Sequence, residues 1–169
     1  MTATPLDPDR ALEVRSLVNM LDEILKRVGA AFDQAGVPLP ERRYWTLSQP
    51  AADCEQVTVS FVQAYLGPPG DEAMRPQNCN SPRSAAVDVQ IVRCIPTVGS
   101  RGRAPEPKAI QSASEQLAVD AYLLLDIAAD LDTWDPVGAP GIGVIATLDA
   151  NEPQGGFQGV TLHLTAAIP

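Results

Sequence analysis

The chain has 169 residues and a formal net charge of -9, with 45% hydrophobic and 20% charged residues. This length fits one domain, and this composition is typical of a folded globular protein rather than a disordered chain. Residues 1–108 contain 12 basic and 13 acidic side chains, whereas residues 109–169 contain no basic and 8 acidic ones. Because nucleic-acid binding needs clustered lysines and arginines, neither the total charge nor the last third of the chain predicts it.

Membrane, exported and zinc-binding proteins are also disfavoured by the sequence. No stretch approaches the roughly 20 apolar residues that span a bilayer, and residues 1–9 lack the basic start and apolar run of an export signal. The chain has three cysteines at wide spacings, no C-x-x-C pair and a single histidine, which do not make a usual zinc site. We therefore expect a soluble product that is not exported, with no membrane, metal or other cofactor.

The first predicted element is a long amphipathic helix that begins near Pro8. Asp7 and Pro8 are typical of a helix start, because aspartate caps free N–H groups and proline suits the first helical position. Apolar residues recur at helical spacing as far as Phe32. Gly36 should end the helix, since glycine adopts the left-handed C-cap and the following prolines cannot continue the turn. A short strand is expected over residues 43–47.

Two longer strands with one buried face are predicted next. From residue 56 to 65, and again from 85 to 95, apolar and polar residues alternate, which is typical of half-buried strands. If these strands pair about the centre of their loop, residues whose numbers sum to about 148 or 149 face each other, which sets Cys54 near Cys94 or Ile95. A disulfide between Cys54 and Cys94 fits that distance, whereas a cytoplasmic product favours free thiols, and both alternatives stay open.

The second part of the chain predicts another helix followed by two strands. Apolar residues on one stripe indicate a helix from about residue 108 to 131, and alternation indicates strands near 142–148 and 157–168. The predicted fold class is α+β, with a mixed or antiparallel sheet of four to five strands. Two long helices should pack on one face of this sheet, and the expected order is α-β-β-β-α-β-β.

Two long loops without periodicity interrupt this single domain, which spans residues 1–169. They cover residues 66–84 and 96–107, and loops of such length inside compact domains are usually functional or disordered. Guanidinium groups suit acidic partner surfaces, so the arginines of these loops are candidate contacts, although exposed arginines usually contribute little. These interaction candidates are Arg75, Arg83, Arg101 and Arg103.

The sequence contains no convincing catalytic motif. Gly138, Gly141 and Gly143 have a dinucleotide-like spacing, but they follow a helix and open a strand, whereas a phosphate-binding loop needs the reverse order. His163 should lie on the less buried face of its strand, with no serine or cysteine at motif spacing. We therefore predict no enzyme and no catalytic residue. A small-molecule-binding or enzymatic domain is the less favoured alternative, and a pocket joining His163 to the acidic residues 126–135 would be its sign.

Acidic residues gather along the second predicted helix and just after it. The run from residue 130 to 135 lacks the glycine and distal glutamate of an EF-hand calcium loop. Acidic side chains near a helix C-terminus oppose the macrodipole, and this unfavourable placement hints at a use for their field. The residues expected to form an acidic surface are Glu115, Asp120, Asp126, Asp130, Asp132 and Asp135.

The order of elements and the text of two strands resemble a known family. Residues 54–61 read CEQVTVSF, and residues 84–93 read SAAVDVQIVR. Together with the long loop between these strands, and over residues 11–168 as a whole, the chain resembles the tail terminator proteins of long-tailed (siphovirus-type) actinobacterial phages.

This resemblance implies a structural virion protein in the tail, assembled in the host cytoplasm. Such a subunit would form a homo-hexameric ring on the tail tube protein, stop addition of tube subunits and join the tail to the head-tail connector protein. DNA would pass through without specific binding, and the acidic residues would line the lumen or a rim, because negative walls repel phosphates. Another head-to-tail completion protein or a tail tube protein shares these traits and stays an alternative.

Overall fold

The computed structural model describes residues 8–51, 55–70, 83–98, 102–132 and 144–168. It confirms an α+β fold with the predicted order α-β-β-β-α-β-β. The elements are α1 (Pro8–Ala35), β1 (Arg42–Thr46), β2 (Gln56–Leu66), β3 (Arg83–Cys94), α2 (Pro107–Asp132), β4 (Ile145–Ala150) and β5 (Phe157–Ile168). Neither helix is long and apolar enough, within the described residues, to cross a membrane.

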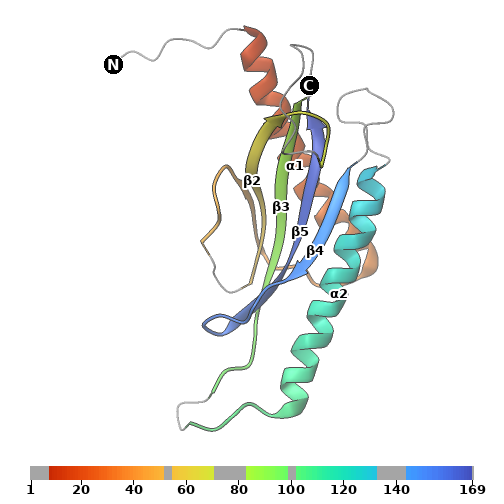
Figure 1. Ribbon diagram of the computed structural model, residues 1–169. Coiled ribbons are helices and arrows are strands. Elements are labelled where there is room, and N and C mark those ends of the chain that lie inside the picture. Colours follow the sequence, from red (N-terminus) through yellow and green to blue (C-terminus); the bar gives the residue numbers. More distant parts are fainter. Residues whose placement is uncertain (1–7, 52–54, 71–82, 99–101, 133–143, 169) are drawn as a thin grey trace.

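The strands form one mixed sheet of five strands in the order β1-β2-β3-β5-β4 (Figure 1). β1 is parallel to β2, and the other three neighbouring pairs are antiparallel. The predicted pairing about the loop centre is confirmed, since Gln56 opposes Val92, numbers that sum to 148. Past an irregularity after Phe61 the sum becomes 149, as in the pair Ala64 and Ala85.

Both helices pack on the same face of the sheet, as predicted. α1 contacts β1 and β2, whereas α2 contacts β3, β4 and β5 (Figure 1). One side of each central strand carries aliphatic residues that pack against these helices. Their burial from water supplies the main driving force for folding. The buried strand residues of this core are Val57, Val59, Ala85, Val87, Val89, Ile91, Val160, Leu162 and Leu164.

The ends of the elements follow local rules that the sequence shows only in part. Gly36 has a φ of 65° and the N–H of Val37 donates to the carbonyl of Phe32, so the first helix ends where predicted. β4 begins three residues later and ends two residues later than the predicted strand near 142–148. Its ladder extends to the pair Ala150 and Val160, because the hairpin turns later than the loss of alternation suggests.

Cys94, the last residue of β3, is disulfide-bonded. The other two cysteines, Cys54 and Cys79, lie outside the described residues. The free-thiol alternative is therefore wrong for Cys94, whereas its pairing with Cys54, which the sequence left open, lies outside the described residues.

Candidate functional site

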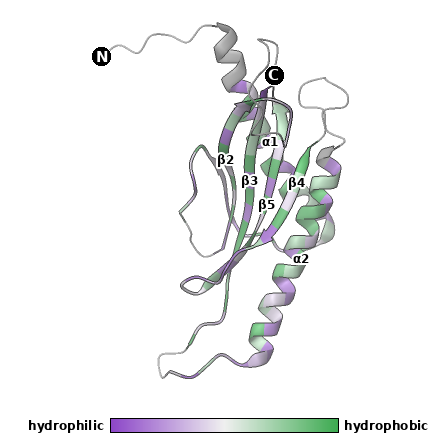
Figure 2. Cartoon of the chain, viewed as in Figure 1, coloured by the Kyte–Doolittle hydropathy of each residue, from purple (hydrophilic) through white to green (hydrophobic). Residues whose placement is uncertain are grey.

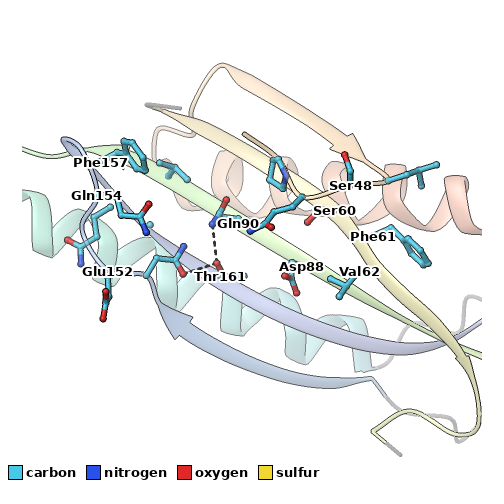
Figure 3. A pocket seen from close by; sticks show the side chains of 17 residues that line it. Ser48, Ser60, Phe61, Val62, Asp88, Gln90, Glu152, Gln154, Phe157 and Thr161 are labelled. Carbon is cyan, nitrogen blue, oxygen red and sulfur yellow. Dashed lines mark hydrogen bonds between the residues drawn. The ribbon is translucent and has the colours of Figure 1, made fainter. Parts of the chain in front are cut away.

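The sheet face turned away from the helices is polar, and we call it the open face. It carries polar side chains from β2, β3 and β5, namely Gln56, Thr58, Ser60, Asp88, Gln90, Thr161 and His163. Residues 47–50 and the hairpin between β4 and β5 border a cavity of about 740 Å³ on this face (Figure 3). A polar concave surface of this size suits contact with a polar partner.

A chain of hydrogen bonds attaches the hairpin to the open face. Gln90 Nε2 donates to Thr161 Oγ1 at 3.4 Å, and Thr161 Oγ1 donates to Asn151 Oδ1 at 3.1 Å (Figure 3). Thr58 Oγ1 is buried and has no hydrogen-bond partner among the described residues. Leaving such a hydroxyl unpaired is unfavourable, so the open face is not optimised for stability alone.

His163 lies between two carboxylates on the open face. Its Nδ1 is 2.6 Å from Asp88 Oδ1, and its Nε2 is 3.3 Å from Asp149 Oδ2. Nδ1 and Asp88 Oδ1 form a hydrogen bond in which the role of the ring nitrogen depends on the tautomer of the imidazole. The side chain is 43% exposed, which confirms the expected placement on the less buried face. The arrangement links β3, β5 and β4 across the sheet.

The structure does not bring His163 together with the acidic residues of α2. Asp126 and Asp130 line a separate cavity of about 550 Å³ between α1 and α2, on the helix side of the sheet. Residues 133–143, which include Asp135, lie outside the described part of the chain. The sign expected for a small-molecule site is therefore absent from the described residues.

Asp120 does not belong to an acidic surface, contrary to the expectation from the sequence. Its carboxylate is fully buried, and Arg93 Nε and Nη2 each donate to it at 2.9 Å. Gln116 Nε2 adds a third hydrogen bond at 3.2 Å, and Arg93 Nη2 also donates to the carbonyl of Pro38. This bidentate pair joins α2 to β3 and to the segment after α1, a structural role.

The other acidic candidates in the described region are exposed on α2. Glu115 accepts a hydrogen bond from Gln111 Nε2, Asp126 is exposed, and Asp130 forms a 2.8 Å ion pair with Arg27 of α1. The side chain of Asp132 and the whole of Asp135 lie outside the described part. Exposed negative charge therefore remains on α2, although Arg27 partly neutralises its C-terminal end.

The two loop arginines that the structure describes are not brought together. Arg83 begins β3, and Arg103 follows the other end of that strand, so these two exposed residues belong to opposite ends of the sheet. Arg75 and Arg101 lie outside the described residues. On α1, by contrast, cations pair locally, and the hydrogen bond from Lys26 to Asp22 raises the pKa of the lysine.

Two surfaces were missed by sequence reasoning, and the first lies on α2. We define the α2 flank as the exposed residues Ala118, Tyr122, Leu125 and Ala129. Tyr122 is 66% and Leu125 49% exposed, whereas Leu123 faces α1. Because successive residues turn by about 100° around a helix, Leu125 projects on the side of α2 away from α1. Figure 2 shows that the part of α2 beside β4 is mostly hydrophobic.

The second surface consists of the two outer strands of the sheet. No strand pairs with the outer side of β1 or β4 in the residues that the structure describes. β1 exposes Arg42 and Arg43, and the Arg42 guanidinium lies 5.5 Å from the centre of the Tyr44 ring. β4 exposes Ile145 and Asp149. One edge thus presents cations, whereas the other presents an anion and an apolar side chain.

No protein-family model matches this chain, and no curated protein sequence matches it either. Within the described ranges, no group of three or more histidine, cysteine or acidic side chains is placed to hold a metal ion.

Proposed function

We propose that this chain is a structural virion protein, a tail terminator whose ring caps the tail tube. The observation that carries the proposal is the pair of open sheet edges in the described structure, together with the exposed α2 flank. Unpaired strand edges and exposed apolar side chains favour association with further protein. The resemblance of residues 54–61 and 84–93 to tail terminators supports the phage-tail setting.

The proposed mechanism is assembly rather than catalysis. Copies of the subunit associate head to tail, and a rotation that closes after six copies gives a ring instead of a growing filament. One rim of the ring binds the end of the tail tube and stops its polymerisation, and the other joins the head connector. DNA passes through the centre without specific binding.

Charged residues have separate parts in this proposal. Glu115, Asp126 and Asp130 are exposed on α2, and we place them at the lumen or at a rim, where they repel phosphates. Arg83 and Arg103 are proposed to contact neighbouring subunits or the tube, since guanidinium groups match acidic surfaces. Asp120 is left out, because its buried carboxylate is already paired with Arg93.

Native mass measurement of the purified protein, alone and with preformed tail tubes, tests this function. A terminator gives a discrete hexamer whose size does not grow with protein concentration, either free or at the tube end. A tail tube protein, the nearest alternative, gives polymers that lengthen with concentration. A protein that stays monomeric in the presence of tubes and leaves their growth unchanged would contradict the proposal.

A further inference from the structure

We infer that neighbouring copies join by continuing the sheet, with β4 of one copy antiparallel to β1 of the next and Arg42 beside Asp149. This inference rests on the proposed ring and adds which surfaces meet within it. Strand addition at an open edge satisfies main-chain hydrogen bonds, while the side chains along both strands select the partner.

The strand directions favour an antiparallel joint. β1 runs with β2, and three successive antiparallel pairings follow, from β2 to β3, from β3 to β5 and from β5 to β4. The two outer strands therefore run in opposite directions. When a second copy is placed beside the first in the same orientation, its β1 meets β4 of the first copy in the antiparallel sense.

The two edges also match in length and in side-chain alternation. β1 has 5 residues and β4 has 6. Arg42 opposes Gln56 of the open face, and Asp149 opposes Thr161 of that face, so both side chains lie on the open side. In a sheet that continues from one copy to the next, open-face residues of β4 must lie beside open-face residues of β1. A shift of the register by one residue would move every side chain of a strand to the other face.

One antiparallel register places Arg42 beside Asp149 and uses the whole of β1. In this register, positions on the open face meet positions on the open face, and the two remaining positions meet on the helix side. The five pairs are Arg42 with Asp149, Arg43 with Leu148, Tyr44 with Thr147, Trp45 with Ala146, and Thr46 with Ile145.

Charge distinguishes this joint from a symmetric one. Asp149 is 73% exposed, and both arginines of β1 are exposed, with Glu41 beside them. In an antiparallel pair of two β1 strands over their full length, Arg42 opposes Thr46, and in the corresponding pair of two β4 strands over residues 145–149, Asp149 opposes Ile145. Neither symmetric pair contains a contact between opposite charges, whereas the head-to-tail pair sets Arg42 beside Asp149, so opposite charge favours the head-to-tail contact.

The helix layer continues in the same direction. α1 contacts β1, and α2 contacts β4, so joining these strands brings the α2 flank of one copy towards α1 of the next. On α1, Val18 and Leu25 lie on the side away from α2 and are only half-buried. They offer apolar cover for Tyr122 and Leu125, whose exposure is otherwise unexplained.

Cysteine cross-linking tests the register. In the variant Tyr44→Cys/Thr147→Cys, oxidation should join each copy to the next and give a ladder of covalent oligomers up to the ring. The matched control is Tyr44→Cys/Leu148→Cys, in which the second cysteine lies on the helix side. Each single variant shows the background from the native cysteines. A ring that forms in both double variants but cross-links equally in each would overturn the inference.

Charge exchange tests the recognition. Arg42→Glu should raise the dissociation constant of the ring about tenfold or more, because an attraction becomes a repulsion. Arg42→Glu/Asp149→Arg should recover most of that loss, and Lys26→Glu, which reverses an exposed cation of α1, should leave assembly unchanged. A ring that tolerates Arg42→Glu overturns this inference but leaves the proposed function standing. A wild-type protein that neither assembles nor caps tubes overturns the proposed function itself.

Discussion

The ion pair of Arg93 and Asp120 is a residue-scale feature that holds three parts of the fold together. Asp120 is fully buried, and Arg93 contacts both its carboxylate and the carbonyl of Pro38. Removing one partner of a buried pair leaves an uncompensated charge, which costs much more than the pair itself contributes. This contact is therefore a vulnerable point of the described structure.

We expect Asp120→Ala to lower the free energy of unfolding by about 3–5 kcal/mol, measured by urea denaturation. Asp126→Ala, six residues further on the exposed surface of α2, is the control and should change it by less than about 0.5 kcal/mol. The double variant Arg93→Met/Asp120→Leu should recover most of the lost stability, because it removes both charges. Equal effects of the two single aspartate variants would contradict the structural role of Asp120.

At this scale the sequence predicted where side chains lie better than what they contact. The alternation of β5 correctly assigned His163 to the less buried face. Asp120 was assigned to the acidic surface by its charge alone, although it shares the buried stripe of Leu117 and Leu124. Its partner Arg93 is 27 positions away in the chain, and no local pattern shows that contact.

The N-terminal part of α2 is an element with little support from the rest of the molecule. Between residues 107 and 116 every residue except Ala113 and Gln116 is exposed, and Leu117 is the first buried residue of the helix. Figure 1 shows this part of the helix extending beyond the end of the sheet. An isolated helix of this length is marginal in water, since most helical stability in proteins comes from packing.

Hydrogen exchange measured on the unassembled subunit should divide α2 into two parts. We expect amides of residues 111–116 to exchange about a hundredfold faster than those of residues 121–128, which pack on the sheet. Residues 111–116 should become protected in the assembled ring if they contact a neighbour. Uniform protection along α2 in the monomer would show that the projecting turns are stable without a partner.

The existence and type of every helix and strand were predicted, whereas the pairing of the edge strands and the exact bounds of β4 were not. α1, α2, β2, β3 and β5 follow local periodicity, so their existence and type are visible in the sequence. The parallel pairing of β1 with β2 and the later boundaries of β4 depend on long-range register, which no local pattern shows. The open edges and the α2 flank escaped prediction for the same reason.

The whole molecule separates its charges more finely than the sequence suggests. The last third of the chain contains 8 charged residues, and all of them are acidic. Nevertheless, Asp120 is buried and Asp130 is paired with Arg27. Glu115 and Asp126 are the described acids of α2 that remain exposed without an ion pair to a basic residue in the structure. The lumen proposal therefore depends chiefly on these two positions.

Charge reversal tests whether these acids face the channel. Rings of the variant Glu115→Lys/Asp126→Lys should retain duplex DNA. The plot of log binding constant against log salt concentration should become steeper by about one unit of slope for each lysine that reaches a phosphate. The control Asp33→Lys/Glu106→Lys makes the same change in net charge at exposed positions outside α2. Wild-type rings should not retain DNA. Equal DNA binding by both variants would exclude a specific placement of Glu115 and Asp126 at the lumen.

The parallel pairing of β1 with β2 has a consequence for solubility. It makes the outer strands antiparallel to each other. In the proposed joint, identical subunits therefore complete one another, and the proposed ring would leave no sheet edge open. Until the ring closes, every free subunit exposes two templates for uncontrolled strand addition. In the proposed ring, assembly and protection from aggregation would be the same event, and a subunit made in excess of the tails it is proposed to cap would be the form most prone to precipitate.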